Sequence, residues 1–161
     1  MSLQVFLQRF LRAAQVATAV EYRYLEHLAR YVLELSLLDP ALLCYRTSTV
    51  AASALFLSRL LLAKAHASAG ESRPHVIWTR TMEHYTFHQA SELRACVRKL
   101  HAVLLTVSSA ATRMTAVRTK YRSPRRMAVA DMYFVPSFPD SVFERYHSLP
   151  VPAEMLQHVP R

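Results

Sequence analysis

A single glycine, Gly70, is the feature that most limits how this chain can fold. Phosphate-binding loops, tight hairpin turns and doubly wound sheets use glycine where the backbone takes a positive φ or passes close to a ligand. A helical bundle has no such need. With 161 residues, of which 52% are hydrophobic, the chain is long enough for one domain with its own core and too apolar for wholesale disorder. The sequence therefore predicts an all-α domain.

Apolar residues recur at helical spacing in successive segments. In residues 3–14 they include Leu7, Phe10 and Leu11, and Ser2 precedes them as a capping residue. Further helices are expected over residues 20–38, 48–65, 79–84, 91–107 and 111–121, with Ser91 as the cap of the fifth. The pair Asp39-Pro40 ends the second helix, and residues 67–74 form a polar loop.

The third expected helix, residues 48–65, is apolar nearly all round and begins with small residues such as Ala51 and Ala54. Small residues let helix axes approach closely, so this helix is expected at the centre of the bundle. Its apolar run, residues 49–62, is interrupted by Arg59 and is shorter than the roughly 20 residues that cross a bilayer. We therefore predict no membrane span.

The N-terminus and the cysteines indicate an intracellular protein. The first ten residues lack the basic start and the apolar stretch of a signal peptide. Cys44 and Cys96 are far apart in sequence, which argues against a disulfide framework and against a CxxC metal site. Both thiols are expected to be buried as small apolar groups.

Positive charge is concentrated in one segment. From Arg94 to Arg126 the sequence has nine Lys or Arg and no Asp or Glu, so this segment accounts for the net charge of +9. The nine residues form a candidate partner-binding basic stripe: Arg94, Arg98, Lys99, Arg113, Arg118, Lys120, Arg122, Arg125 and Arg126. Such a stripe fits an acidic protein surface or nucleic acid, and a solvated helix face is the alternative.

Several segments carry motifs in a recognisable order. They are LQRFLRAAQ at 7–15, LARYVLELSLLD at 28–39, STVAASA at 48–54, WTRTMEHY at 78–85, ELRACVRKLH at 92–101 and KYRSPRRMAVA at 120–130. The series resembles the C-terminal cyclin box of mitotic, A/B-type cyclins, whose second helix typically reads LAxYLxELxLLD and whose closing segment reads KYxSxKxxxVA. The resemblance covers residues 3–131.

The chain departs from the cyclin pattern at three positions. Thr47 stands where the family has a proline before the third helix, and His84 stands where it has the glycine of a TGY-like turn. Ala95 replaces a proline before the cysteine of the fifth helix. These departures bear on helix boundaries rather than on the fold.

The resemblance implies an all-α, cyclin-like five-helix bundle with a short extra C-terminal helix and an irregular tail. Residues 1–131 would form the domain and residues 132–161 a proline-containing tail, packed through Tyr133, Phe134 and Phe138. The implied function is that of a regulatory subunit of a cyclin-dependent protein serine/threonine kinase in cell-cycle control, located in nucleus and cytoplasm. It would act by protein–protein binding and not as an enzyme, without a cofactor. The kinase contact would come mainly from an N-terminal cyclin box that these residues do not include.

Three alternatives to this function are nucleic-acid binding, a metal site and an acid pair. In a cyclin-fold transcription factor domain, the basic stripe would contact nucleic-acid phosphates. His84 and His88 have the spacing of two metal ligands on one helix face. A metal site is nevertheless disfavoured, because the pattern is not HExxH and residues 85–88 are expected to form a turn. Glu34 and Asp39 are more simply explained as an exposed helix end than as an acid pair.

The segment Ser123-Pro124-Arg125-Arg126 carries a candidate phosphorylation site at Ser123. Proline-directed, cyclin-dependent kinases prefer a Ser-Pro pair followed by a basic residue. A phosphate there would add negative charge to the basic stripe. The alternative is that Pro124 only ends a helix beside solvated arginines.

Overall fold

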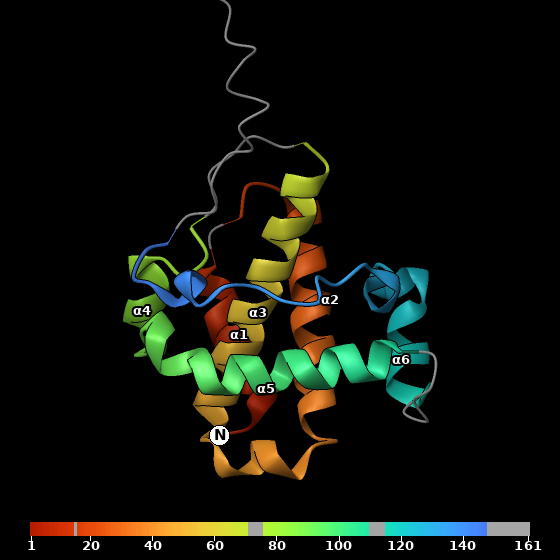
Figure 1. Cartoon of the computed structure of the whole chain (residues 1–161), viewed down its shortest axis with the longest axis horizontal. Helices are drawn as coiled ribbons and strands as arrows, with labels where there is room; N and C mark the ends of the chain where they lie inside the picture. The colour runs from red at the N-terminus through yellow and green to blue at the C-terminus, as the bar shows by residue number, and fades with distance from the viewer. Residues whose placement is uncertain (15, 71–75, 110–114, 148–161) are drawn as a thin grey trace, which may run out of the picture.

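The computed structural model of the chain describes residues 1–14, 16–70, 76–109 and 115–147. Within these residues there are six α-helices and no β-strand, which confirms the all-α prediction. Five helices form the bundle: α1 (Leu3–Ala13), α2 (Ala19–Ser36), α3 (Thr47–Ser68), α4 (Arg80–Thr86) and α5 (Ala90–Ser108) (Figure 1). The short extra helix is α6 (Thr115–Arg122), and four 3₁₀ turns complete the elements: η1 (Pro40–Cys44), η2 (Pro124–Arg126), η3 (Val129–Asp131) and η4 (Asp140–Phe143).

Some sequence predictions fall outside the described residues. These are Arg113 of the basic stripe, positions 111–114 of the sixth helix, positions 71–74 of the polar loop and positions 148–161 of the tail.

Side chains cap the starts of α1, α2 and α4, and the start of α5 differs from the prediction. The Ser2 hydroxyl accepts a hydrogen bond from the Val5 N–H at 3.4 Å, as expected for an N-cap. The predicted cap Ser91 of the fifth helix is wrong, because α5 begins at Ala90 and Gln89 is its N-cap. The Glu92 carboxylate accepts from the Gln89 N–H at 2.6 Å, so the acid of the first turn reaches back and satisfies the cap.

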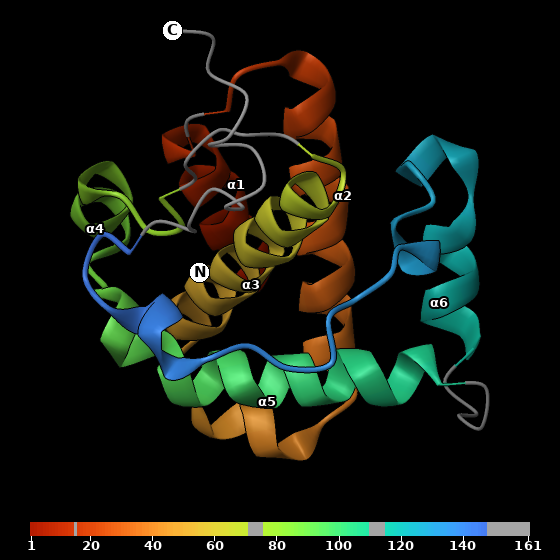
Figure 2. The same ribbon diagram turned by 45° about the horizontal axis from the view of Figure 1, so that its top comes forward.

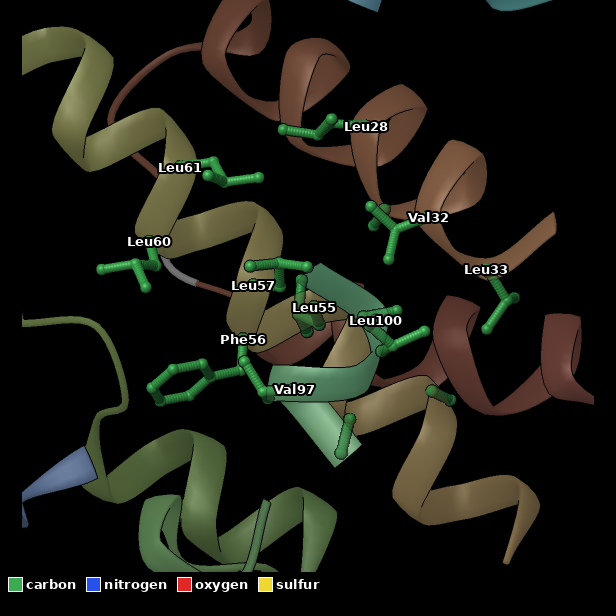
Figure 3. Packing of buried hydrophobic residues seen from close by; sticks show 14 of the residues in the cluster. Leu28, Val32, Leu33, Leu55, Phe56, Leu57, Leu60, Leu61, Val97 and Leu100 are labelled. Atoms are coloured by element: carbon green, nitrogen blue, oxygen red, sulfur yellow. The ribbon is translucent and has the colours of Figure 1, made fainter. Parts of the chain in front are cut away.

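The centre of the bundle is α3, as the small residues predicted. It packs against α1, α2 and α5, and Ala51 and Ala54 are fully buried. Figure 3 shows side chains of α2, α3 and α5 meeting in one core, among them Val32, Leu57 and Leu100. Of the described helices, α3 alone is long and apolar enough to cross a membrane by length and composition, and 67% of that window is buried inside the bundle.

The charged residue in this core helix, Arg59, is accommodated by backbone carbonyls. Its guanidinium donates to the oxygen of Ile77 at 2.7 Å and to that of Val76 at 3.1 Å. Burial lowers the pKa of Arg59 from its ordinary value. The contact holds the segment that leads into α4 against the middle of α3.

The helix α5 runs across α3 and α2, and α6 stands at its C-terminal end beside α2 (Figures 1 and 2). After η3 the chain returns along α5 towards α4 (Figure 2). We call residues 132–147 the C-terminal strap. Its underside is buried and apolar, and consists of Phe134, Phe138, Val142 and Phe143. Phe143 stacks on Phe56 of α3 with ring centroids 5.1 Å apart.

Two predicted burials are wrong and others are confirmed. Phe134 and Phe138 pack into the core as expected, but Tyr133 is 79% exposed, because it lies on the outer side of the strap. Cys96 is buried on the core face of α5, whereas Cys44 ends η1 and is exposed. The boundary after residue 131 stays a prediction, although the core receives side chains from both sides of it.

The single glycine follows α3 with φ 88°, where a residue with a Cβ would be strained. Four other described residues, none of them glycine, also have positive φ: Phe87, Met127, Ala128 and Tyr146. Five described residues thus have a left-handed backbone conformation, and one of the five is a glycine. The strained positions lie after α4, after η2 and in the strap.

Candidate protein-binding surface

The structure divides the basic stripe into two groups. Arg94, Arg98 and Lys99 lie on α5, in its first half. The second group lies on α6 and η2 and consists of Arg118, Lys120, Arg122, Arg125 and Arg126. Since α6 stands beyond the C-terminal end of α5, the two groups do not form one continuous face (Figure 2).

In the first group, Arg98 holds the C-terminal strap on α5. Its guanidinium donates to the backbone oxygen of Phe138 at 2.8 Å and to the Asp140 carboxylate at 2.7 Å. It also lies over the Phe138 ring, 4.3 Å from the centroid. The hydrogen bond from Arg98 lowers the pKa of the Asp140 carboxyl below its ordinary value. Arg98 is therefore a structural residue and not a free cation.

Its neighbours on α5 have similar but looser contacts. Arg94 lies 3.7 Å from the other oxygen of Asp140, and both side chains are more than half exposed. The Lys99 ammonium lies 5.3 Å from the centroid of the Tyr45 ring. His101 follows Lys99 by two residues, and its Nε2 lies 2.8 Å from the backbone oxygen of Val135. Because a carbonyl oxygen only accepts, Nε2 carries the proton in this contact. In the first group, only Arg98 is half-buried against the strap, whereas Arg94 and Lys99 are exposed.

In the second group, Lys120 pairs with an acid of α2. Its Nζ lies 2.6 Å from Oε1 of Glu34, and the Tyr121 hydroxyl donates to the same oxygen at 2.8 Å. The prediction that Glu34 belongs to an exposed helix end is wrong, because its side chain is 22% exposed and binds both Lys120 and Tyr121. Asp39 caps η1, accepting from the Ala41 N–H at 2.9 Å.

The remaining cations of this group differ in the contacts that they make with other residues of the chain. Arg122 pairs with Asp131 of η3 at 2.9 Å. The Arg126 guanidinium lies over the Tyr121 ring, 4.9 Å from the centroid. Among the residues that the structure describes, the buried Nε of Arg118 has no hydrogen-bond partner. The buried hydroxyl of Tyr31 on α2 has none there either, and burial raises the pKa of Tyr31 to about 12. Arg125 is exposed on η2.

Ser123 lies between α6 and η2, at the edge of the second group. It is half-buried, its backbone is extended (φ −66°, ψ 147°), and its hydroxyl donates to the backbone oxygen of Lys120 at 3.1 Å. Pro124 begins η2 directly after it and is exposed.

The two candidate metal-binding histidines do not share a helix face. His84 lies in α4, whereas His88 follows the end of that helix at Thr86. Burial lowers the pKa of His88. Over the described residues, no group of three or more His, Cys, Asp and Glu is placed to hold a metal ion.

Two exposed apolar corners of the surface were not predicted from the sequence. One, the aliphatic corner, is made of Leu37, Leu38 and Leu43, where α2 leads into η1; Leu37 is 62% exposed and Leu43 73%. The other, the aromatic corner, is made of Tyr85 and Phe87 at the end of α4, and Phe87 is 87% exposed. Beside it lies a hollow of about 440 Å³ lined by Arg80, His84, Phe87 and Tyr146 among others. Exposed apolar groups of this kind are typical of protein-binding surfaces.

Comparison with known proteins matches the chain to one family. The cyclin C-terminal domain matches residues 2–133. Cyclin-A1-4 of Oryza sativa subsp. japonica is 40% identical over 139 residues, which are 86% of this chain and 36% of that protein. Cyclin-A1-1 of the same organism is 41% identical over 138 residues, 86% of this chain and 25% of the relative. Cyclin-A2-4 of Arabidopsis thaliana is 36% identical over 140 residues, 87% of this chain and 28% of the relative. The chain thus spans between 25% and 36% of the length of these relatives.

Proposed function

The chain belongs to the cyclin family as a C-terminal cyclin domain, and on that premise we propose that it acts as a regulatory subunit, or part of one, of a cyclin-dependent protein serine/threonine kinase in cell-cycle control. The observation that carries the proposal is the similarity to A-type cyclins over 86% of the chain, together with the cyclin C-terminal domain match over residues 2–133, which contain all six described helices. It acts by binding protein and not by catalysis. Glu34, one of the acids considered for catalysis, instead binds Lys120 and Tyr121 of α6.

We propose that the main kinase contact is made by an N-terminal cyclin box and that this domain supports that box. The relatives extend well beyond the domain that this chain matches. The aliphatic and aromatic corners support protein contact, because leaving Leu43 and Phe87 in water gives up the free energy of burying them. Burial against a partner domain would recover it.

The test is a pull-down of the full-length gene product with a panel of cyclin-dependent kinases, followed by a kinase assay with a histone substrate. We expect binding and stimulation of at least one kinase. Two double variants locate the contact: Leu37→Asp with Leu43→Asp, and Tyr85→Asp with Phe87→Asp. Gln4→Asp with Gln8→Asp is the matched control, because both are exposed polar residues of α1 outside the two corners and the basic stripe. A gene product that neither binds nor stimulates any kinase contradicts the proposal.

Nucleic-acid binding has less support. Most described members of the basic stripe contact an acid or an aromatic ring of the same chain, and the stripe is split between α5 and α6. Electrostatic binding to duplex DNA would weaken steeply with salt. We therefore expect no salt-sensitive binding of this chain to duplex DNA at low ionic strength; tight binding there would favour the transcription-factor alternative.

We also propose that the protein resides in nucleus and cytoplasm, as a cyclin-dependent kinase subunit would. Imaging a fluorescent fusion of the gene product through the cell cycle tests this. Exclusive residence in a membrane compartment would contradict it.

A further inference from the structure

Ser123 is the single serine or threonine of this chain that precedes a proline. Two arginines, Arg125 and Arg126, follow at the second and third positions after it. Proline-directed protein kinases recognise this arrangement. The proline fixes the backbone after the acceptor, and a basic residue at the third position pairs with acidic groups of the kinase. The rest of the sequence offers such a kinase no second acceptor.

The position of Ser123 in the fold allows a kinase to approach. Its own backbone is extended, with φ −66° and ψ 147°, the conformation that a residue before proline favours. Pro124 and Arg125 are exposed. The hydroxyl makes one hydrogen bond, to the oxygen of Lys120 at 3.1 Å, and rotation about the Cα–Cβ bond releases it. No core packing has to be broken to expose the oxygen.

The turn after Ser123 must open for the segment to lie extended in a kinase. This turn, η2, has three residues, and the Ser123 oxygen accepts from the N–H groups of Arg126 at 3.0 Å and Ala128 at 3.1 Å. Met127 and Ala128, the next two residues, have φ 58° and φ 49°. The left-handed conformation strains residues that carry a Cβ, so opening the turn relieves this strain as it breaks the hydrogen bonds.

From these observations we propose that Ser123 is a phosphorylation site for a proline-directed protein kinase acting on the folded chain. In the reaction, Oγ of Ser123 forms a bond to the γ-phosphorus of ATP, and the bond from that phosphorus to the β–γ bridging oxygen breaks. ADP leaves, and the hydroxyl proton passes to the catalytic carboxylate of the kinase. The proposal is independent of the proposed function, because the modifying kinase need not be one that this chain binds.

The phosphate would change the second basic group. It brings a charge of about −1.5 to −2 at neutral pH beside Lys120, Arg122 and Arg126. It can no longer donate to the Lys120 oxygen, and it competes with Glu34 for the Lys120 ammonium, which now lies 2.6 Å from that carboxylate. Modification would therefore weaken both the attraction of this group for an acidic partner and the contact between α6 and α2.

The experiment incubates the full chain with a purified, active cyclin-dependent kinase complex as the proline-directed probe kinase, with Mg²⁺ and radiolabelled ATP. We expect about one phosphate per chain, located at Ser123 by mass spectrometry of proteolytic fragments, since one Ser-Pro pair is present. Ser123→Ala removes the incorporation and Ser123→Thr retains it. Arg126→Ala slows it roughly tenfold through loss of one charge-assisted contact. Arg12→Ala is the matched control, because Arg12 is an exposed arginine of α1, far in sequence from the acceptor and outside the basic stripe; it leaves the rate unchanged.

Circular dichroism of each variant shows that it is folded, so that a lost signal reports recognition. Two results would overturn the proposal. One is no incorporation while a Ser-Pro control protein is phosphorylated in the same tube. The other is equal incorporation into wild type and Ser123→Ala. Neither result bears on the pull-down with the full-length gene product, so failure of this proposal and failure of the proposed function are distinguishable.

Discussion

Glu34 of α2 accepts a hydrogen bond from Tyr121 of α6 at 2.8 Å, across 87 positions of sequence. Tyr121 is 1% exposed, and its ring lies 5.1 Å from that of Tyr31 on the same helix as Glu34. Burial and the neighbouring carboxylate raise the pKa of Tyr121, so its hydroxyl remains a donor at neutral pH. Glu34 and Tyr121 thus join the extra helix to the bundle.

Removing this acceptor should destabilise the domain. Glu34→Ala leaves the buried Tyr121 hydroxyl without a partner, and we expect a loss of about 2 kcal/mol in the free energy of unfolding, measured by urea denaturation. Glu34→Gln keeps an acceptor and should cost about half as much. The control is Glu26→Ala, which removes the pairing with Arg30 within α2 and should cost about 0.5 kcal/mol. Equal losses for Glu34→Ala and Glu26→Ala would contradict the role of Glu34.

The contact between Arg98 and Asp140 should make the stability of the strap depend on pH. Because the folded-state pKa of Asp140 lies below its ordinary value of 3.8, its ionised form favours the folded state above that pH. This contribution is lost as the pH falls below 3.8 towards the folded-state pKa. Urea denaturation should therefore find wild type more stable than Asp140→Asn at pH 7 and equal to it at the acid end of this window. Glu144→Gln, an exposed neighbour outside the contact, serves as control. A difference between wild type and Asp140→Asn that is constant with pH would rule out the ion pair as its cause.

Phe87 should be replaceable with a gain in stability. It ends α4 with φ 59° and is 87% exposed, so its side chain gains little from burial and its Cβ is strained. Asparagine tolerates this conformation better, and Phe87→Asn should raise the free energy of unfolding by about 0.5 to 1 kcal/mol. Thermal denaturation measures the change. Tyr85→Asn is the comparison, because Tyr85 lies within the helix and its replacement should bring no gain. Unchanged or lower stability of Phe87→Asn would show that the side chain has a structural role.

The two thiols should react at different rates. Cys44 is exposed, whereas Cys96 is buried on α5 and burial raises its pKa, which further lowers the fraction of reactive thiolate. Iodoacetamide should therefore label one thiol of the folded chain quickly and the second only on unfolding in urea. Mass spectrometry should place the fast label on Cys44, and Cys44→Ala should remove it. Rapid labelling of Cys96 in the folded chain would contradict its burial.

The helices could be predicted because their information is local. Apolar spacing located α1 and α5, and the small residues at the start of α3 placed it at the centre. The exact start of α5 was missed because Ser91 is of a type preferred at the N-cap, whereas the actual N-cap, Gln89, is satisfied by the Glu92 side chain. Cys44 was misplaced because its apolar side chain suggests burial, whereas η1 leaves it at the surface.

The basic stripe shows what sequence alone does not contain. Nine cations without acids nearby in sequence suggest a surface open to a partner. Arg98, however, finds its acceptors 40 and 42 positions later, at Phe138 and Asp140, and Lys120 finds its acid 86 positions earlier, at Glu34. Only the packing of the strap and of α6 brings these groups together. The prediction for Ser123, by contrast, needs no contact between distant residues, because its motif is contiguous in sequence.

The stacking of Phe143 on Phe56 has a consequence for synthesis on the ribosome. The chain emerges from its N-terminus, so α3 is complete long before the strap that covers one side of it. Until Phe143 has left the exit tunnel, part of the apolar surface of the central helix has no covering side chain and is open to chaperones or to other nascent chains. The synthesis of the strap, and not the appearance of the helices, therefore completes the core.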